Sequence, residues 1–394
     1  MSIFDPAAAT ATYLAQLPSE AHAKAQAYTQ GGHWILLWGT LISLLISWLI
    51  VRSGILTGLR NRLEKTKPRP WLVSFVVTFV YLAVSWVFGL PWALYAEWWR
   101  EKSYGLNNQT WSGWLGEGAL NAGISTVVLA VFFMVLYAVV RRAPKTWWLW
   151  SSGLATLGVI CIIVLAPVFI EPLFNTYADV PQGPVRDAIV KLAKVSGVPS
   201  DKIYVYNGSK QTSMYTANVS GLGGTARVAI SDAMLNKATL AEVRGVVGHE
   251  MGHYAHMHSL WFTAGFSLVF ALQFWLIHVL FSPASRLLGA AAVKGLADPA
   301  GLPVVMAILA VLTLLFLPVT NFMSRAAESD ADRFSLQHAN EPDGMAAALV
   351  KTIEYRAASP SRLEEIIFYD HPAVSVRIRR CMDWKASHMA NTTP

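Results

Sequence analysis

The chain has 394 residues, of which 54% are hydrophobic and only 14% are charged. Soluble domains carry about 25% charged residues, so this composition excludes an ordinary soluble protein and predicts one that lies in a lipid bilayer. The formal net charge of +7 does not indicate a nucleic-acid partner, because the basic residues flank apolar runs, as they do in membrane proteins. Two cysteines, Cys161 and Cys381, provide neither a disulfide framework nor a thiolate metal site.

Apolar runs long enough to cross a bilayer recur along the chain. A membrane helix needs about 20 mainly apolar residues, because its backbone must satisfy its own hydrogen bonds in lipid. Ahead of these runs, residues 1–32 lack the order of a signal peptide and predict a short helix at the membrane interface. Six segments qualify as spans, at residues 33–51, 71–95, 119–140, 147–170, 260–281 and 303–320.

A different composition separates the fourth and fifth spans. The stretch "VRDAIVKLAKVSGV" has helical periodicity, and "KIYVYNGS" and "ARVAISDAML" predict short strands, with "SGLGG" (220–224) as the turn between neighbours. The sequence therefore predicts a mainly α, polytopic membrane protein in which about six helices enclose a chamber and carry a small α/β domain. Its parts are expected at 33–170 (four spans), 171–258 (first part of the domain), 259–320 (a membrane hairpin) and 321–394 (second part of the domain).

The stretch "VVGHEMGHYAHMHS" (246–259) contains the pattern H-E-x-x-H. On a helix, residues four apart project from one face, so His249 and His253 can bind one tetrahedral zinc ion. Glu250 then lies beside the first ligand and can take a proton from a water that the zinc activates. Thr239 and Glu242 are typical of an N-terminal capping box for this helix. The pattern predicts a hydrolytic zinc site, and the alternative is an interfacial helix with solvated histidines.

A catalytic zinc ion needs a third protein ligand and an open fourth position. The best-placed residue is Glu328, in "NFMSRAAESDADRF" directly after the last span. Asp332 lies one helical turn further on the same face and can hydrogen-bond a ligating histidine. On spacing alone, Glu328, Asp330 and Asp332 are equally consistent with a solvated acidic face that pairs with nearby arginines.

Two more histidines follow the motif. The offsets of His256 and His258 from His253, three and five residues, diverge around a helix, so both cannot converge on the same ion. We interpret them as residues at the membrane interface or as outer hydrogen-bond partners of the ligands.

Several separated motifs together resemble one family, the type I CAAX prenyl endopeptidases, which are integral-membrane zinc proteases. The resemblance covers most of the chain, from "EAHAKAQAY" (20–28) through "GLPWALYAEWWREKSYGLNNQT" (89–110), "NGSKQTSMYTANVSG" and "GHEMGHYAHMH" to "YDHPAVSVRI". The stretch "NFMSRAAESDADRF" is similar to the family's N-x-x-S-R-x-x-E-x-x-A-D element. This similarity places the third zinc ligand on Glu328 and hydrogen-bonding partners of the ligands on Asn321 and Asp332.

The resemblance also implies residues that contact the substrate. His371 and Arg377, in the similar H-P-x-x-x-x-R segment, stand where the family contacts the substrate carbonyl and the oxyanion, whose charge cationic donors stabilise. Thr216, Ala217 and Asn218 fall in the strand to which the family adds its substrate as a further β-strand. The family usually has asparagine where Thr216 stands, which leaves backbone pairing intact but changes a side-chain contact.

Many family members have an additional span before the segment that matches residues 20–28.

The orientation of the chain in the membrane has two conflicting indications. The loops at 52–69 and 141–145 are strongly basic, and the positive-inside rule puts them in the cytoplasm and the catalytic domain on the other face. The resemblance implies a cytoplasmic catalytic domain. We expect the family arrangement, in a bacterial inner membrane, because the metal domain must fold together with its flanking spans.

These observations predict a multi-pass membrane zinc metalloendopeptidase with one Zn²⁺ per chain, surrounded by lipid and without a nucleic-acid partner. Its substrate is expected to be a hydrophobic or lipidated peptide, or a segment of a membrane protein. One alternative is a non-enzymatic metal-binding protein, transporter or assembly factor, which predicts carboxylates or histidines along an intramembrane path. Another is an inactive relative, which predicts the loss of a zinc ligand or of Glu250. The sequence has few carboxylates or histidines within the spans, and it contains all the expected zinc ligands and Glu250.

Overall fold

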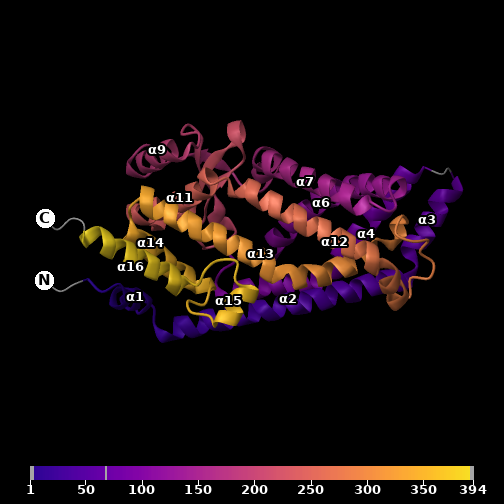
Figure 1. Ribbon diagram of the computed structural model, residues 1–394, viewed down its shortest axis with the longest axis horizontal. Coiled ribbons are helices and arrows are strands. Elements are labelled where there is room, and N and C mark those ends of the chain that lie inside the picture. The colour runs from indigo at the N-terminus through magenta and orange to yellow at the C-terminus, as the bar shows by residue number, and fades with distance from the viewer. Residues whose placement is uncertain (1–3, 67–68, 391–394) are drawn as a thin grey trace.

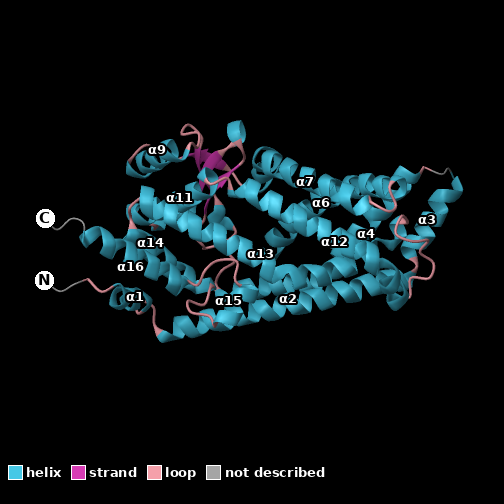
Figure 2. Ribbon diagram, in the orientation of Figure 1, coloured by secondary structure: helices cyan, strands magenta, loops and turns pink. Residues whose placement is uncertain are grey.

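The computed structural model describes residues 4–66 and 69–390 and shows a mainly helical chain with one small sheet (Figure 2). Lys67 of the basic loop and the ends of the expected terminal segments, residues 1–3 and 391–394, lie outside the described residues. Within the described parts, six long helical stretches are apolar enough to cross a membrane. Each predicted span lies in one of them, so the expected number of spans is confirmed.

The spans comprise a set of long helices, two of which are extended by π-helical turns and short helices. The π-helical turns lie just after Pro91 and around Pro167, where the proline ring interrupts the regular helical ladder. The six spans are α2 (Ser19–Ser53), α4 (Pro70–Ala93) with α5 (Arg100–Tyr104), α6 (Trp111–Arg142), α7 (Trp147–Leu165) with α8 (Glu171–Phe174), α12 (His258–Leu288) and α13 (Leu302–His338).

The six spans form a closed ring. Following contacts from one span to the next, the order is α2, α4, α6, α7, α12 and α13, and α13 returns to α2. At the end far from the sheet, α3 (Ile55–Thr66) and the packed apolar side chains of two buried clusters fill the space between helices. A cavity of about 650 Å³ lies between α4, α6 and Phe174, and Gln109, Glu117 and Asn121 are among its lining residues. Polar lining between membrane helices is typical of a space that water can enter.

The helix α13 extends well beyond the lipid-spanning part. With 37 residues, α13 is about 55 Å long, whereas the hydrocarbon core of a bilayer is about 30 Å thick. The sixth predicted span and the polar stretch behind it are therefore one continuous helix. The expected lead-in over residues 1–32 is divided differently, because α1 (Pro6–Leu14) ends before Pro18 and α2 begins directly after it, at Ser19.

The sheet and its helices form one end of the molecule, and α1 lies at the same end (Figure 1). The strand order is β1-β2-β4-β3, with β2 and β4 parallel and the other pairs antiparallel, so β3 is an edge strand. A buried apolar cluster joins the sheet to α9 and α11. The elements are β1 (Tyr177–Asp179), α9 (Pro184–Ser196), β2 (Ile203–Tyr206), β3 (Ala217–Ser220), β4 (Arg227–Ser231), α10 (Asp232–Lys237) and α11 (Leu240–Ala255).

The C-terminal helices cover the other side of α11. The helices α14 (Pro342–Lys351), α15 (Arg362–Phe368) and α16 (Val374–Ala390) follow α13. A second buried cluster contains Ala25 of α2 and side chains of α14 and α16, and residues of α1 pack against it. The N-terminal helix therefore contacts the C-terminal half of the domain, where the Tyr13 hydroxyl donates to the Asp343 carboxylate at 2.8 Å.

Glycines set the distance between α11 and its neighbours. A Cβ at Gly252 would lie 2.9 Å from the Phe334 Cβ and 3.0 Å from the Ala331 Cα of α13. A Cβ at Gly248 would lie 2.9 Å from the Ser335 Oγ, also on α13. The two backbones can therefore approach this closely only without side chains at these positions.

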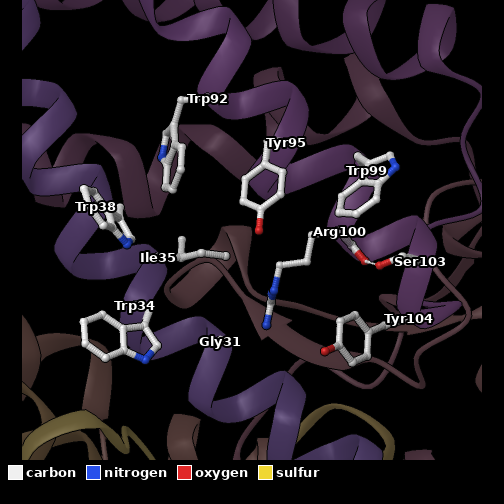
Figure 3. Close-up of a pocket in the computed structure, with 10 residues that line it drawn as sticks. All are labelled: Gly31, Trp34, Ile35, Trp38, Trp92, Tyr95, Trp99, Arg100, Ser103 and Tyr104. Atoms are coloured by element: carbon white, nitrogen blue, oxygen red, sulfur yellow. Dashed lines mark hydrogen bonds between the residues drawn. The ribbon is translucent and has the colours of Figure 1, made fainter.

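A cavity of about 640 Å³ lies between α2 and the α4–α5 stretch (Figure 3). Aromatic side chains form most of its wall, and the Tyr95 hydroxyl and the Arg100 side chain point into the space between them. The Arg100 guanidinium stacks over the Tyr28 ring at 4.0 Å and pairs with Glu101 at 2.9 Å. Its charge is therefore already balanced within the protein.

We expect Gly252→Ala to destabilise the fold. Overpacking a tight contact costs about 1–3 kcal/mol, which exceeds the roughly 1 kcal/mol that alanine gains over glycine in a helix. The matched control is Gly58→Ala on α3, where nothing lies within 4 Å of the added Cβ. Thermal unfolding of the purified protein in detergent should show a lower midpoint for Gly252→Ala alone. Equal midpoints for the two variants would contradict the close contact.

Candidate metal centre

Three side chains from α11 and α13 converge at one point. His249 and His253 lie one turn apart on α11, and Glu328 faces them from α13. The Nε2 atoms of the two histidines are 3.2 Å apart, and they lie 3.2 and 3.3 Å from the carboxylate oxygens of Glu328. Zinc–ligand bonds of about 2.0 Å in a tetrahedron separate neighbouring ligand atoms by about 3.3 Å. The arrangement of these three residues therefore fits a tetrahedral zinc ion.

The surroundings of the cluster favour a cation. Glu328 is only 7% exposed, and its buried Oε2 forms no hydrogen bond with correct geometry. Burial alone lowers the pKa of His249, but the hydrogen bond to Asp332 and the nearby Glu328 carboxylate outweigh it and raise the pKa from 6.5 to about 10. The site therefore stabilises positive charge at this imidazole, which is the charge that a metal ion supplies there.

Behind His249, Asp332 and Arg377 form a buried chain of hydrogen bonds. The His249 Nδ1–H donates to Asp332 at 2.9 Å, which leaves Nε2 free to bind a metal. Arg377 donates to the same carboxylate through Nε at 2.8 Å and Nη2 at 2.6 Å. Burial lowers the pKa of Arg377, but Asp332 raises it further than burial lowers it. Asp332 thus contacts His249, and Arg377, expected at the oxyanion, also orients Asp332.

Behind His253, the partner is another histidine. The Nδ1 atoms of His253 and His258 are 3.0 Å apart, and His258 is 6% exposed. The expectation that His256 and His258 follow the offsets of one helix is wrong, because α11 ends at Ala255 and Met257 adopts a left-handed conformation with φ of 53°. This break turns His258 back toward the motif, where it is an outer hydrogen-bond partner of His253.

His371 lies on the open side of the cluster. Its Nε2 is 3.3 Å from the Glu328 Oε1, and its Nδ1 is 2.7 Å from the Asp370 carboxylate. Asp370, which the sequence analysis did not identify, therefore orients His371. The only sequence signal for it is its position directly before the histidine.

Asn321 is placed differently from the expectation. It lies seven residues before Glu328 on α13, about 10 Å along the helix, and its amide donates to the Ile367 carbonyl at 2.8 Å. Its side chain therefore ties α13 to the end of α15 and is no hydrogen-bond partner of a metal ligand.

Glu250 lines a cleft of about 560 Å³ together with His249, His371 and Arg377. Burial raises the pKa of the Glu250 carboxyl above its usual range, although the neighbouring histidines act in the opposite direction. A carboxylate with a raised pKa holds a proton more readily, as a general base requires. The cleft continues past the Met214 and Tyr215 side chains toward β3.

Residues 216–218 lie at the edge strand that borders this cleft. The Ser231 backbone N–H donates to the Thr216 carbonyl at 2.8 Å, so Thr216 directs its backbone toward β4. Backbone direction alternates along an antiparallel strand, so Asn218 also faces β4 and Ala217 directs its N–H and C=O to the free edge. The Thr216 hydroxyl bonds Tyr206, and the Asn218 side-chain oxygen is buried without a partner.

Comparison with known families agrees with this geometry. The model "Peptidase family M48" matches residues 180–385, which is more than half of the chain. The chain belongs to peptidase family M48. A second model, "CAAX prenyl protease N-terminal, five membrane helices", matches residues 7–176, where the described residues contain four long spans. This M48 peptidase is therefore a multi-pass membrane zinc metalloendopeptidase similar to CAAX prenyl proteases, as predicted, and the non-enzymatic and inactive alternatives are set aside.

Individual relatives cover most of the M48 peptidase. An uncharacterized metalloprotease of Bacillus subtilis, YhfN, is 27% identical over 92% of this chain and 85% of its own length. A CAAX prenyl protease 1 homolog of Arabidopsis thaliana is 23% identical over 93% and 89%. The crystal structure of S. mikatae Ste24p superposes with a TM-score of 0.76 at 21% identity, covering 93% of this chain and 90% of that one. The two proteins share the fold.

We expect Glu328→Ala to lower the amount of bound zinc, because it removes the ligand that α13 contributes. Metal analysis of the purified protein measures this loss. Asp383→Asn removes an exposed carboxylate paired with Arg379 without touching the cluster of His249, His253 and Glu328, and should retain full zinc. Full occupancy in Glu328→Ala would mean that another residue is the third ligand.

Proposed function

We propose that this M48 peptidase hydrolyses peptide bonds in hydrophobic or lipidated peptides, or in exposed segments of membrane proteins, with one zinc ion per chain. The observation that carries the proposal is the convergence of His249, His253 and Glu328 at one point, with His249 and Glu250 lining the cleft beside it. An extended peptide can enter this cleft.

The proposed ligands are His249, His253 and Glu328. They would hold a zinc ion, which would supply Lewis-acid polarisation of the scissile carbonyl and activation of the attacking water at neutral pH. Asp332 keeps the His249 Nε2 unprotonated by accepting the proton of Nδ1 at 2.9 Å. Arg377 holds Asp332 in that position through two hydrogen bonds.

Glu250 is the proposed general base. It accepts a proton from the attacking water and returns it to the amine of the leaving peptide, so no covalent intermediate forms. The oxyanion that develops on the substrate lies in the cleft with His371 and Arg377. Both can donate hydrogen bonds to it, in a site from which the substrate excludes water.

The substrate backbone is proposed to pair with the free edge of β3. Ala217 directs its backbone groups to that edge, so an extended peptide can add to the sheet there. Apolar side chains along the cleft, among them Met214, Met345 and Leu349, suit a hydrophobic sequence.

A cationic side chain at the cleft suits the C-terminal end of the substrate peptide. Lys351 is paired with Glu242 at 2.8 Å, but Arg356 has only a distant contact, 3.8 Å, with Asp370. Arg356 therefore keeps capacity to bind a carboxylate, and a C-terminal carboxylate close to the scissile bond would supply one. CAAX prenyl protease 1 of Saccharomyces cerevisiae is 30% identical over 45% of this chain, which supports a lipidated C-terminal peptide as substrate.

The decisive experiment is Glu250→Gln. The variant should bind zinc as the wild type does, because Glu250 is no ligand, but should cleave peptides at least about 1,000-fold more slowly, since it lacks the base. Metal analysis and cleavage of a farnesylated C-terminal peptide in detergent measure the two properties. Comparing membrane proteomes of cells that contain either form would identify natural substrates. Retained cleavage would refute the assigned role.

Ala217→Pro tests the edge-strand proposal. Proline removes the N–H that faces the free edge but none that pairs with β4, and edge strands tolerate it there. We expect a higher KM with unchanged zinc content and thermal midpoint. A KM equal to that of the wild type would mean that substrate does not pair with β3.

We also propose that the catalytic end faces the cytoplasm. The helix α3, which carries much of the first basic segment, lies at the opposite end (Figure 1), but its Arg60 is buried in an ion pair with Asp298, so part of this charge has a structural role. Since α16 lies at the catalytic end (Figure 1), a C-terminal fluorescent protein that matures only in the cytoplasm should fluoresce. Activity of a C-terminal alkaline phosphatase fusion instead would place this end on the other face.

A further inference from the structure

Beside the catalytic cluster lies a second group of possible metal ligands, His256, His258 and Asp330. Their ligand atoms all lie within 4.8 Å of one another. They come from three parts of the chain: His256 directly follows α11, His258 begins α12 and Asp330 projects from α13. His256 is exposed, so the group is accessible to solvent, whereas His258 is buried.

The backbone turn that assembles this group is strained. Among the described residues, only Met257 and Asn340 have a positive φ without being glycine. A left-handed conformation costs such a residue about 1–2 kcal/mol. At Met257 this conformation separates α11 from α12 and brings His256 and His258 to one side. The His256 ring also packs edge-on against Phe334 of α13, with ring centroids 5.7 Å apart, which holds it next to Asp330's helix.

We propose that His256, His258 and Asp330 form a second site for a divalent transition-metal ion, and that its occupation inhibits the peptidase. Two imidazoles and one carboxylate suit Zn²⁺ and not Mg²⁺, which requires oxygen ligands. The Asp330 carboxylate is available, because its partner is the exposed Arg333 at 3.3 Å, a pair of little energetic value.

Inhibition follows because a neutral imidazole has only one nitrogen with a free lone pair, so His258 cannot both bind a metal ion and accept a hydrogen bond from His253. With Nε2 directed at the catalytic metal, His253 carries its proton on Nδ1 and donates it to the His258 Nδ1 at 3.0 Å. A metal on the His258 Nδ1 takes that lone pair directly. A metal on Nε2 instead forces the proton of His258 onto Nδ1, where it opposes the proton of His253. Either way His253 loses its acceptor, and losing such a partner typically costs about 10–100-fold in activity or metal affinity.

The test uses purified protein in detergent that carries one zinc per chain. Isothermal titration with zinc chloride should show a second equivalent, weaker than the first, and activity should fall about 10–100-fold as it binds. His256→Ala and Asp330→Asn should keep basal activity but need at least tenfold more zinc for half-inhibition. Asp383→Asn is the matched control, because it removes an exposed carboxylate paired with Arg379 in the same way but lies outside the group.

Two results would overturn the inference: a titration with no second equivalent, or equal zinc inhibition of the wild type and both variants. The binding half of the inference stands by itself, and only its effect on activity rests on the proposed function. The inactive Glu250→Gln form separates them, since it should still bind the second equivalent. A failed catalytic assignment would leave that binding result unchanged.

Discussion

The close packing of α11 on α13 is the contact on which the metal centre depends. Gly248 and Gly252 alternate with His249 and His253 along α11, so each ligand is next to a residue without a side chain. The glycines let the backbones approach until the ligand atoms of both helices lie 3.2–3.3 Å apart. A hydrogen bond of 2.6 Å from the Ser335 hydroxyl to the Gly245 carbonyl fixes the same crossing. The packing of α11 on α13 thus sets the distances between the side chains proposed to bind the metal.

This crossing connects the metal centre to the membrane. Glu328, the proposed third ligand, belongs to a helix whose first half is a membrane span, and His258 is the first residue of another span. The ring of spans, packed at its far end, keeps these two helices in a fixed relation. The site is therefore built partly by the domain and partly by the membrane helices.

The two histidines of the motif have unequal surroundings. His249 is supported by the buried Asp332 carboxylate, which Arg377 holds in turn through two hydrogen bonds. His253 is supported by a neutral imidazole whose outer side lies near solvent and two further ligand atoms. The first support is rigid and buried, whereas the second can be changed by whatever binds His258. Any control of the enzyme through its metal centre would therefore act at His253.

The sequence by itself determined the six spans and the helix of the zinc motif with its Thr239–Glu242 capping box, and it predicted the roles proposed for His249, Glu250 and His253. These features depend on hydropathy and on residues at most four positions apart, so local patterns contain them. Glu328 needed the resemblance to a known family, since its spacing alone fits an acidic surface equally well. Only the tertiary structure decided the hydrogen bonds of Arg377, Asn321 and His258. Arg377 meets a ligand 128 residues away, Asn321 turns to α15, and His258 depends on a helix break at Met257 that periodicity does not reveal. Such contacts arise from how whole helices pack, and no local pattern records that packing.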